Sequence, residues 1–261
     1  MQILTKDASI TLYSAYFNEA YHSINDGALQ ETLHKHILPA VALKLDSKKL
    51  ESKMLNVLDI CFGLGFNTLS LYSVLKKRGF NGVVCVDSPE LELLENLKEH
   101  PYPKELASAK EVLCALEKKR AFKKGNFSIK LHLGDAREIL KGFLAEIQKS
   151  SKEKFNVVFQ DPFSPLKNHY LWTYEYFKML YALSSDDVVV TTYSCNSCML
   201  YSAFLAGFYA FKVVQKNVRD SVVLTKTKDT PRLDLEFVEK VVKIDIEHKI
   251  RVNSKLKGLY D

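Results

Sequence analysis

A buried strand, a glycine-rich turn and a helix follow one another early in this sequence, and this order constrains the fold most. The apolar run Leu55–Ile60 predicts the strand, and Gly63 and Gly65 come directly after it. A helical pattern begins near Asn67 and ends before Gly79, where a glycine favours a helix end. Because glycine tolerates positive φ and has no Cβ, a nucleotide-like ligand can approach this backbone at the helix N-terminus.

The acidic residue before the turn narrows the choice of ligand. Asp59 lies near the end of the predicted strand, and Thr68 replaces the third glycine of the dinucleotide-binding pattern G-x-G-x-x-G. A carboxylate at this position suits a ligand with a cationic end, such as S-adenosylmethionine, better than a diphosphate. A glycine pair also closes ordinary strand–helix turns, so the G-x-G alone is weak evidence.

Two further predicted strands also lead into acidic residues. The apolar run 81–87 ends in Asp87, about twenty residues after the glycines, where nucleotide-binding βαβ units place the acid that binds ribose. Pro89 then predicts the start of a helix. The strand Phe127–Leu133 is followed by Asp135. Together these acids predict a ligand held across the carboxyl ends of a parallel sheet.

A fourth strand, Phe155–Gln160, leads into the residues that we expect to carry the chemistry. Asp161 comes next, in a loop made stiff by Pro162 and Pro165. A stiff loop at a strand end can present one carboxylate and the aromatic face of Phe163 to a reacting atom. Asp161 can accept hydrogen bonds from an amine and direct its lone pair toward an electrophilic methyl group. The alternative is a structural loop in which backbone N–H groups satisfy Asp161.

The alternation of strands and helices predicts an α/β fold with a mostly parallel, Rossmann-like sheet of seven strands. The last strands would form an antiparallel pair at the sheet edge, as in class I methyltransferases. We expect an N-terminal extension (1–50, a β-hairpin plus helix), a methyltransferase domain (51–227) and a charged C-terminal tail (228–261). The remaining predicted elements are helices near 104–122, 172–183 and 196–207, and strands at 186–193, 208–215 and 221–227.

Composition agrees with an ordinary globular enzyme. The chain is 47% hydrophobic and 26% charged, and it has no apolar run long enough to cross a membrane and no N-terminal signal segment. We therefore expect a cytoplasmic protein. The net charge of +6 permits a polyanionic partner. Basic residues between Lys118 and Lys124 offer a phosphate-binding patch, or a solvated helix end. The pair Cys195 and Cys198 has no partner motif, so we expect reduced thiols and no metal.

Longer motifs resemble the methyltransferase domain of the bacterial tRNA 5-methylaminomethyl-2-thiouridine biosynthesis enzymes, the MnmC family. The resemblance covers most of residues 5–225 and is strongest in the run D-x-F-[SA]-P-x-x-N-x-x-[LM]-W-T, which begins at Asp161. The other matching segments are Tyr21–Ser23, Gly27–Thr32, Phe62–Asn67, Gly134–Ala136 and Thr192–Ser194.

The resemblance implies an S-adenosylmethionine-dependent enzyme that methylates the amine of 5-aminomethyl(-2-thio)uridine at the wobble position of tRNA. Asp161 would lie beside that amine, with Phe163 as an apolar wall. Separate enzymes would supply the aminomethyl group, because the flavin-dependent oxidase domain of the bifunctional enzymes is not expected in this chain. The residues that would contact the substrate are Pro162, Ser164, Lys167, Asn168 and Tyr193.

The same resemblance implies a cofactor site. Gly63, Gly65 and Asn67 would line the methionine end of the cofactor. Asp87 would bind the ribose hydroxyls, with Glu90 as the alternative acid, and Asp135 would face the adenine. The full set of predicted cofactor residues is Asp59, Phe62, Gly63, Gly65, Asn67, Asp87, Gly134, Asp135 and Ala136.

Three rival functions stay open at this point. The first is an aminopropyl- or small-amine transferase like the polyamine synthases, which a large acidic cavity would favour. The second is a non-catalytic RNA-binding protein with a methyltransferase core, which failure to bind S-adenosylmethionine would favour. The third keeps methyl transfer but moves it to another amine, such as that of adenine.

Overall fold

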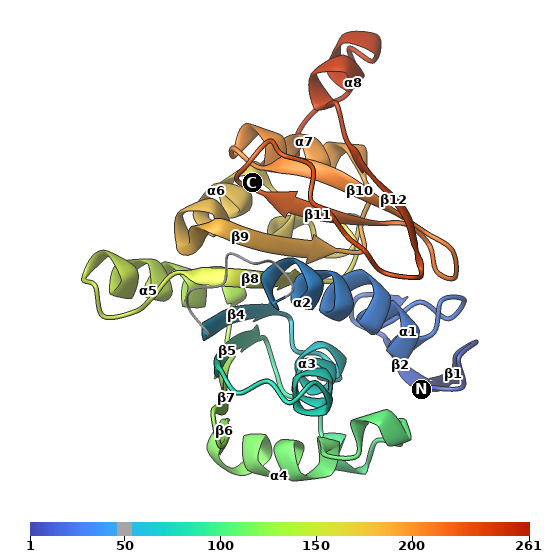
Figure 1. Ribbon diagram of the computed structural model, residues 1–261, viewed down its shortest axis with the longest axis vertical. Helices are drawn as coiled ribbons and strands as arrows, with labels where there is room; N and C mark the ends of the chain where they lie inside the picture. Colours follow the sequence, from blue (N-terminus) through green and yellow to red (C-terminus); the bar gives the residue numbers. More distant parts are fainter. Residues whose placement is uncertain (46–53) are drawn as a thin grey trace.

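The apolar strands of the sequence assemble into one large mixed sheet (Figure 1). The computed structural model describes residues 1–45 and 54–261. The strands of the large sheet are β4 (Met54–Ile60), β5 (Val83–Glu90), β6 (Ala121–Lys124), β7 (Phe127–Leu133), β8 (Phe155–Gln160), β9 (Ser184–Thr192), β10 (Tyr209–Gln215), β11 (Ser221–Thr225) and β12 (Val238–Lys243). Their order is β12-β10-β11-β9-β8-β4-β5-β7-β6. The central strands β9, β8, β4, β5 and β7 pair in parallel. At one edge β6 pairs antiparallel with β7, and at the other β11, β10 and β12 follow β9 in antiparallel pairs.

Helices cover both faces of this sheet and give it two apolar cores. Successive strand residues point to opposite faces, so Val157 and Phe159 of β8 pack in one core and Val158 in the other. The first core is covered by α1 (Ala28–Glu31), η1 (Thr32–Ile37, a π-helical segment), α2 (Leu38–Leu45), α3 (Phe66–Lys77) and α4 (Ala109–Lys119). The second is covered by α5 (Ala136–Gln148), α6 (Tyr174–Leu183), α7 (Ser197–Leu205) and α8 (Ile246–Val252).

The predicted fold class is confirmed, and within the described residues the sheet has nine strands where the sequence predicted seven. One addition, β6, lies where a helix from 104 to 122 was expected. The helix α4 ends at Lys119, because Arg120 adopts a positive φ of 55° and turns the chain back. The other addition, β12, comes from the predicted tail and pairs antiparallel with β10.

The helix predicted to start at Pro89 is wrong. Pro89 and Glu90 instead continue β5 and pair with His132 and Leu133 of β7. Proline fixes φ but can occupy an extended conformation where its missing N–H is not needed. The chain then runs through a loop to a short 3-10 turn, η2 (Leu97–Glu99). As a result, the carboxyl end of β5 lies three residues later than the sequence indicated.

The N-terminal residues form a separate small sheet. The predicted hairpin is present as β1 (Gln2–Leu4) and β2 (Ile10–Ser14), and β3 (Glu19–Ala20) extends it. The boundary predicted between residues 50 and 51 lies outside the described residues. Figure 1 shows this small sheet beside α1 and α3, and its residues reach the cavity at the carboxyl ends of the parallel strands.

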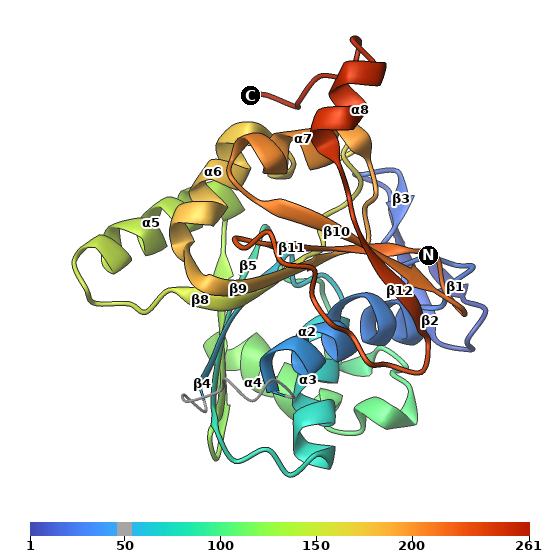
Figure 2. The ribbon, with the colours of Figure 1, turned by 45° about the horizontal axis from the view of Figure 1, so that its top comes forward.

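The last residues of the chain return to the second face of the sheet, where Figure 2 shows the C-terminus near α6, α7 and α8. The Tyr174 N–H donates to the Leu259 carbonyl at 2.7 Å. The Thr173 hydroxyl, which also caps α6, donates to the Asp261 carboxylate at 2.9 Å. The segment after residue 228 is therefore attached to the sheet and to the start of α6.

A buried lysine holds the N-terminal segment against the large sheet. Lys35 lies on η1, is 1% exposed, and donates to Asp26 at 2.7 Å and to Glu31 at 2.9 Å. Arg219, from the loop between β10 and β11, donates to the same Asp26 at 3.1 Å. Because both carboxylates are buried, removing the lysine would leave Glu31 without a cation and Asp26 with Arg219 as its remaining cation.

We expect Lys35→Met to lower the free energy of unfolding by about 3–5 kcal/mol, because it removes the buried cation that Asp26 and Glu31 share. Urea denaturation of the full chain measures this. Lys44→Met is the matched control, since Lys44 is also buried but its partner Asp187 has a side chain that is 70% exposed and can be solvated. Equal losses in the two variants would contradict the role assigned to Lys35.

Candidate active site

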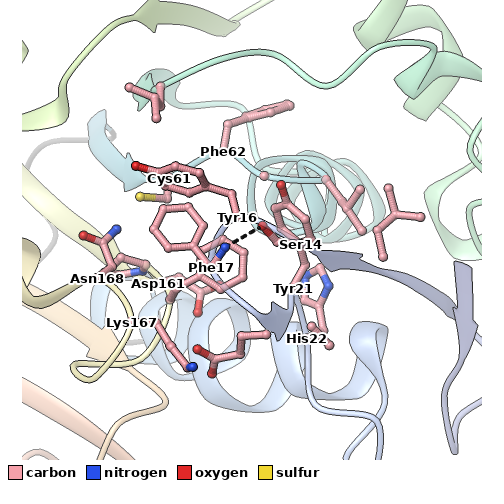
Figure 3. Close-up of a pocket in the computed structure, with 18 of the residues that line it drawn as sticks. Ser14, Tyr16, Phe17, Tyr21, His22, Cys61, Phe62, Asp161, Lys167 and Asn168 are labelled. Carbon is pink, nitrogen blue, oxygen red and sulfur yellow. Dashed lines mark hydrogen bonds between the residues drawn. The ribbon is translucent and has the colours of Figure 1, made fainter. Parts of the chain in front are cut away.

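A cavity of about 1250 Å³ opens at the carboxyl ends of β4, β5, β7 and β8. Residues after those strands form one side, and the N-terminal sheet forms the other. Figure 3 shows Phe17 and Tyr21 from the N-terminal segment facing Asp161 and Asn168 from the loop after β8. The cavity is thus built jointly by the parallel sheet and the segment that precedes it, in the place predicted for a ligand in this class of sheet.

The turn after β4 adopts the conformation that its glycines permit. Gly63 and Gly65 have φ of 52° and 75°, and Cys61 also has a positive φ. A Cβ on Gly65 would lie 2.6 Å from Cζ of Phe62, so this glycine is needed for packing within the turn. Gly63 lines the cavity together with Phe62, whereas Gly65 does not. The predicted cofactor turn is therefore present, with Gly63 as its exposed backbone.

The acid at the end of β5 is Glu90, and the prediction for Asp87 needs correction. Asp87 does not line the cavity. Its carboxylate is 2.7 Å from His132 Nε2 and 2.5 Å from Lys152 Nζ. Burial raises the pKa of Asp87, but the His132 and Lys152 hydrogen bonds outweigh it and hold the pKa below its ordinary value. The strand continues for three residues beyond Asp87, so Glu90 is the acid at its carboxyl end.

Glu90 lines the cavity and organises the glycine turn. Its Oε2 accepts the Gly63 N–H at 2.6 Å, and its Oε1 accepts the Leu91 N–H at 2.8 Å. Burial raises the pKa of Glu90 even though these backbone N–H groups oppose it. A carboxylate offers about four lone-pair sites, so Glu90 retains acceptor capacity for hydroxyl groups in the cavity.

The strand-end acid after β7 has a structural task as well. Asp135 caps α5 by accepting the backbone N–H groups of Arg137 and Glu138. Asp135 and Ala136 both line the cavity, whereas Gly134 does not. The three residues were predicted together, and the structure brings two of them to the cavity wall.

Asn67, in the first turn of α3, joins the acids after β4 and β8. Its amide nitrogen donates to Asp161 Oδ2 at 2.8 Å and lies 3.4 Å from Asp59 Oδ1. Asp59 is fully buried, accepts the Thr68 hydroxyl at 2.6 Å and does not line the cavity. Asp161 and Asn67 do line it. Asp59 therefore lies in the interior next to the cavity wall, where it contacts Asn67 and Thr68 and not the cavity itself.

The two acids have opposite pKa shifts. Burial raises the pKa of Asp59 to about 7, against hydrogen bonds from Thr68 and Asn67, and the nearby Asp161 adds to the rise. Burial also acts to raise the pKa of Asp161, but His36 and Asn67 together hold it below the ordinary value. At neutral pH Asp161 is thus an anion, and Asp59 is close to half protonated.

The Asp161 loop is held rigidly. Phe163 is stacked on Phe17 with ring centroids 4.3 Å apart, and Tyr21 meets it edge-on at 4.9 Å. The buried Trp172 donates its Nε1–H to the Phe163 carbonyl at 2.8 Å, so this side chain packs against the loop and does not line the cavity. The Tyr193 hydroxyl donates to the Pro162 carbonyl at 2.9 Å.

The predicted substrate residues divide into two groups. Pro162, Lys167, Asn168 and Tyr193 line the cavity, as does Phe163. Ser164 does not, because its hydroxyl and its backbone N–H both donate to Glu19 Oε2, at 2.8 and 3.2 Å. This contact ties the catalytic loop to β3 of the N-terminal sheet.

His36 is a site residue that the sequence did not indicate. It lies on η1, is fully buried, and its Nε2 is 3.4 Å from Asp161 Oδ1. The histidine is more than a hundred residues from Asp161 in the chain and belongs to no short motif, so only the packing of η1 on the sheet brings the two together.

The cavity can hold the cofactor implied by the sequence. Asn67 Oδ1 is buried and has no hydrogen-bond partner among residues 1–45 and 54–261, so it can accept from an ammonium group. Glu90 can accept from hydroxyl groups at the end of β5, as argued above. No cluster of three or more metal-ligating side chains occurs in the described part of the chain. No helix in that part is long and apolar enough to cross a membrane.

Comparisons with known proteins agree with this geometry. Residues 98–220 match a family described as S-adenosyl-L-methionine-dependent methyltransferases. The crystal structure of MnmC2 from Aquifex aeolicus superposes with a TM-score of 0.76 and 28% identity, over 89% of this chain and 72% of that one. The chain thus resembles the methyltransferases of the MnmC type over most of its length and has their fold.

The curated relatives that the chain matches are longer than the chain. An uncharacterized protein of Methanocaldococcus jannaschii is 32% identical over 73% of this chain and 49% of its own length. The bifunctional MnmC protein of Legionella pneumophila (strain Lens), named for tRNA 5-methylaminomethyl-2-thiouridine biosynthesis, is 24% identical over 75% of this chain and 32% of its own length. The chain therefore spans about half of the first relative and about one third of the second.

The raised pKa of Asp59 predicts how stability changes with pH. Between its unfolded value of 3.8 and about 7, the folded chain binds a proton that the unfolded chain has released, so the free energy of unfolding falls as pH rises. Asp59→Asn removes this titration. We expect its stability relative to the parent chain to be higher at pH 8 than at pH 5, by about 2–4 kcal/mol. Urea denaturation at the two pH values tests this, and a pH-independent difference would contradict it.

Proposed function

We propose that this chain transfers a methyl group from S-adenosylmethionine to the primary amine of 5-aminomethyl(-2-thio)uridine at the wobble position of tRNA. The observation that carries the proposal is Asp161. It is an oriented carboxylate at the end of β8, held by Asn67, facing a cavity and next to the aromatic group of Phe163, Phe17 and Tyr21.

The residues that would hold the cofactor lie at the ends of β4, β5 and β7. Phe62 and Gly63 offer the turn backbone, Glu90 would accept the ribose hydroxyls, and Asp135 with Ala136 would face the base. The acceptor Asn67 Oδ1 would receive the ammonium of the methionine end. When bound, S-adenosylmethionine supplies an electrophilic methyl group.

Asp161 would accept an N–H of the substrate amine and fix the direction of its lone pair. Orientation of two reacting groups can supply much of a rate enhancement, and the loop contacts of Trp172 and Tyr193 make the carboxylate rigid enough to provide it. Phe163, with Tyr21 and Phe17, would pack against an unstacked base, which enzymes acting on nucleobases take out of the helical stack. Lys167 and Arg219 also line the cavity and could contact a phosphate.

The acidic lining of the cavity raises the rival function of an amine transferase for polyamines. Seven of the lining residues are Asp or Glu. Several already have partners: Glu31 pairs with Lys35, Glu19 binds Ser164, and Asp135 caps α5. The other acids of the lining are Asp161, Glu90, Glu92 and Glu95, so the choice between one small amine and a polycation is left to the experiment.

The experiment combines purified protein, S-adenosylmethionine and tRNA from cells that lack this methylation, followed by mass spectrometry of the nucleosides. We expect one added methyl on 5-aminomethyl(-2-thio)uridine. Parallel reactions with putrescine and spermidine test the rival. Methylation of those amines and not of tRNA would overturn the proposal.

Asp161→Asn should reduce kcat for tRNA methylation by about 100-fold or more, because the amide cannot accept the amine proton or carry the opposing charge. The dissociation constant for S-adenosylmethionine, measured by calorimetry, should change less than about 3-fold. If affinity for the cofactor falls as far as activity, Asp161 binds the cofactor instead.

Glu90→Gln should weaken S-adenosylmethionine binding by about 10-fold or more, because it removes a charged acceptor of hydroxyl groups. Asp87→Asn is the matched control. We expect it to lower the melting temperature, since His132 and Lys152 lose their partner, while cofactor affinity stays within about 3-fold. The reverse pattern would return the ribose role to Asp87.

A further inference from the structure

His36 occupies an unusual position for a buried imidazole. It lies in η1, where the helix widens to π-helical geometry, and such segments are frequent at functional sites. The ring is fully buried and meets Phe159 of β8 edge-on, with centroids 6.2 Å apart. Burying a polar ring costs free energy unless its nitrogens find partners. The partners of the two ring nitrogens therefore show what the residue does.

One nitrogen has a clear partner. His36 Nδ1 is 3.0 Å from the hydroxyl oxygen of Thr191 on β9. Thr191 is also fully buried, and in the described residues its hydroxyl has no other side-chain or backbone acceptor. A hydroxyl with no other acceptor is free to donate to Nδ1, and in that arrangement the ring proton is on Nε2.

The other nitrogen points at the carboxylate of the proposed active site. His36 Nε2 lies 3.4 Å from Asp161 Oδ1, longer than a well-formed hydrogen bond, and it has no other hydrogen-bond partner in the described residues. Asp161 Oδ2 is held separately by Asn67. Catalytic hydrogen bonds are often long without substrate and shorten in the complex.

We propose that His36 is a positioning residue that donates its Nε2–H to Asp161 and keeps this carboxylate ionised and aimed at the substrate amine, with Thr191 fixing the required tautomer. This inference rests on the proposed function for the identity of the amine. The contact between His36 and Asp161 is independent of it.

The surroundings of Asp161 explain why such support is needed. Burial alone would raise the pKa of Asp161, and His36 is the largest of the groups that lower it. Asp59 on β4 adds negative charge when ionised, and burial keeps the nearby His22 neutral by lowering its pKa. The remaining titratable groups facing this space from the other elements are Cys61 after β4, Glu31 on α1 and Tyr193 after β9.

These groups do not replace the imidazole. Burial raises the pKa of Cys61 and of Tyr193, so both stay neutral, and Glu31 is paired with the buried Lys35. Without His36, Asp161 would keep only the Asn67 amide as a close donor. The carboxylate would then take up a proton at a higher pH and lose its ability to accept one from the amine.

The test variant is His36→Leu, assayed for tRNA methylation between pH 6 and pH 9. Dividing the parent kcat/KM by the variant value at each pH cancels the titration of the substrate amine. We expect a deficit that is largest at pH 6 and falls by up to about 7-fold at pH 9, because an acid limb that moves up by about one to three pH units from a pKa below 3.8 leaves as little as about one seventh of the Asp161 carboxylate ionised at pH 6. His36→Gln, whose amide can donate to Asp161, should recover part of the loss at pH 6.

A purely structural role for His36 would give a deficit that does not depend on pH, and this result would overturn the proposal. His34→Leu is the matched control on the same helical segment, because His34 stacks on Phe237 at 4.0 Å and not on the site. It should keep parent activity at each pH. Thermal melting and S-adenosylmethionine binding of all three variants show whether they fold.

A second measurement does not depend on the substrate. In ¹⁵N-labelled protein without cofactor, NMR of the His36 ring should show the proton on Nε2, and Asp161→Asn should shift that Nε2–H signal while Nδ1 changes little. A proton on Nδ1, or an Nε2–H signal that does not shift in Asp161→Asn, would overturn the proposal. If tRNA is not methylated but the ring responds as expected, the proposed substrate is wrong and the role of His36 stands.

Discussion

The side-chain amide of Asn67 holds together the part of the molecule on which the proposed chemistry depends. It lies between Asp59, near the end of β4, and Asp161, which follows the neighbouring parallel strand β8. The glycine turn places Asn67 there, because Gly65 begins α3 in a left-handed conformation and puts Asn67 in the first turn. One strand–turn–helix unit thus provides both the exposed backbone of Gly63 and the support for the carboxylate.

Local patterns in the sequence were enough to predict the parallel core of the fold. Apolar runs ending in acids marked the parallel strands, and Gly79 marked the end of α3, where its φ is 64°. Edge strands were harder to predict. Three of the four residues of β6 are exposed and no residue of β12 is fully buried, so neither has the apolar pattern of a buried strand.

The sequence indicated the cavity residues that lie in short motifs at strand ends. It did not indicate the residues that reach the site only through contacts between distant parts of the chain. Asp161, Phe163 and Gly63 were found because short motifs fix them. Asp87 was taken for the strand-end acid because proline usually argues against a strand, yet β5 continues through Pro89 to Glu90. His36 was missed because its contact with Asp161 exists only once η1 packs across β9 and β8.

The different partners of the two acids explain how both can be buried. Ionising two adjacent carboxylates in a low-dielectric space costs free energy, so the pKa values of the two groups move apart. Asp59 has only a hydroxyl and an amide as donors, and its pKa rises to about 7. Asp161 has His36 as well and stays ionised. The N-terminal segment that supplies His36 is therefore not an accessory to the sheet: it decides which of the two carboxylates carries the negative charge that faces the substrate.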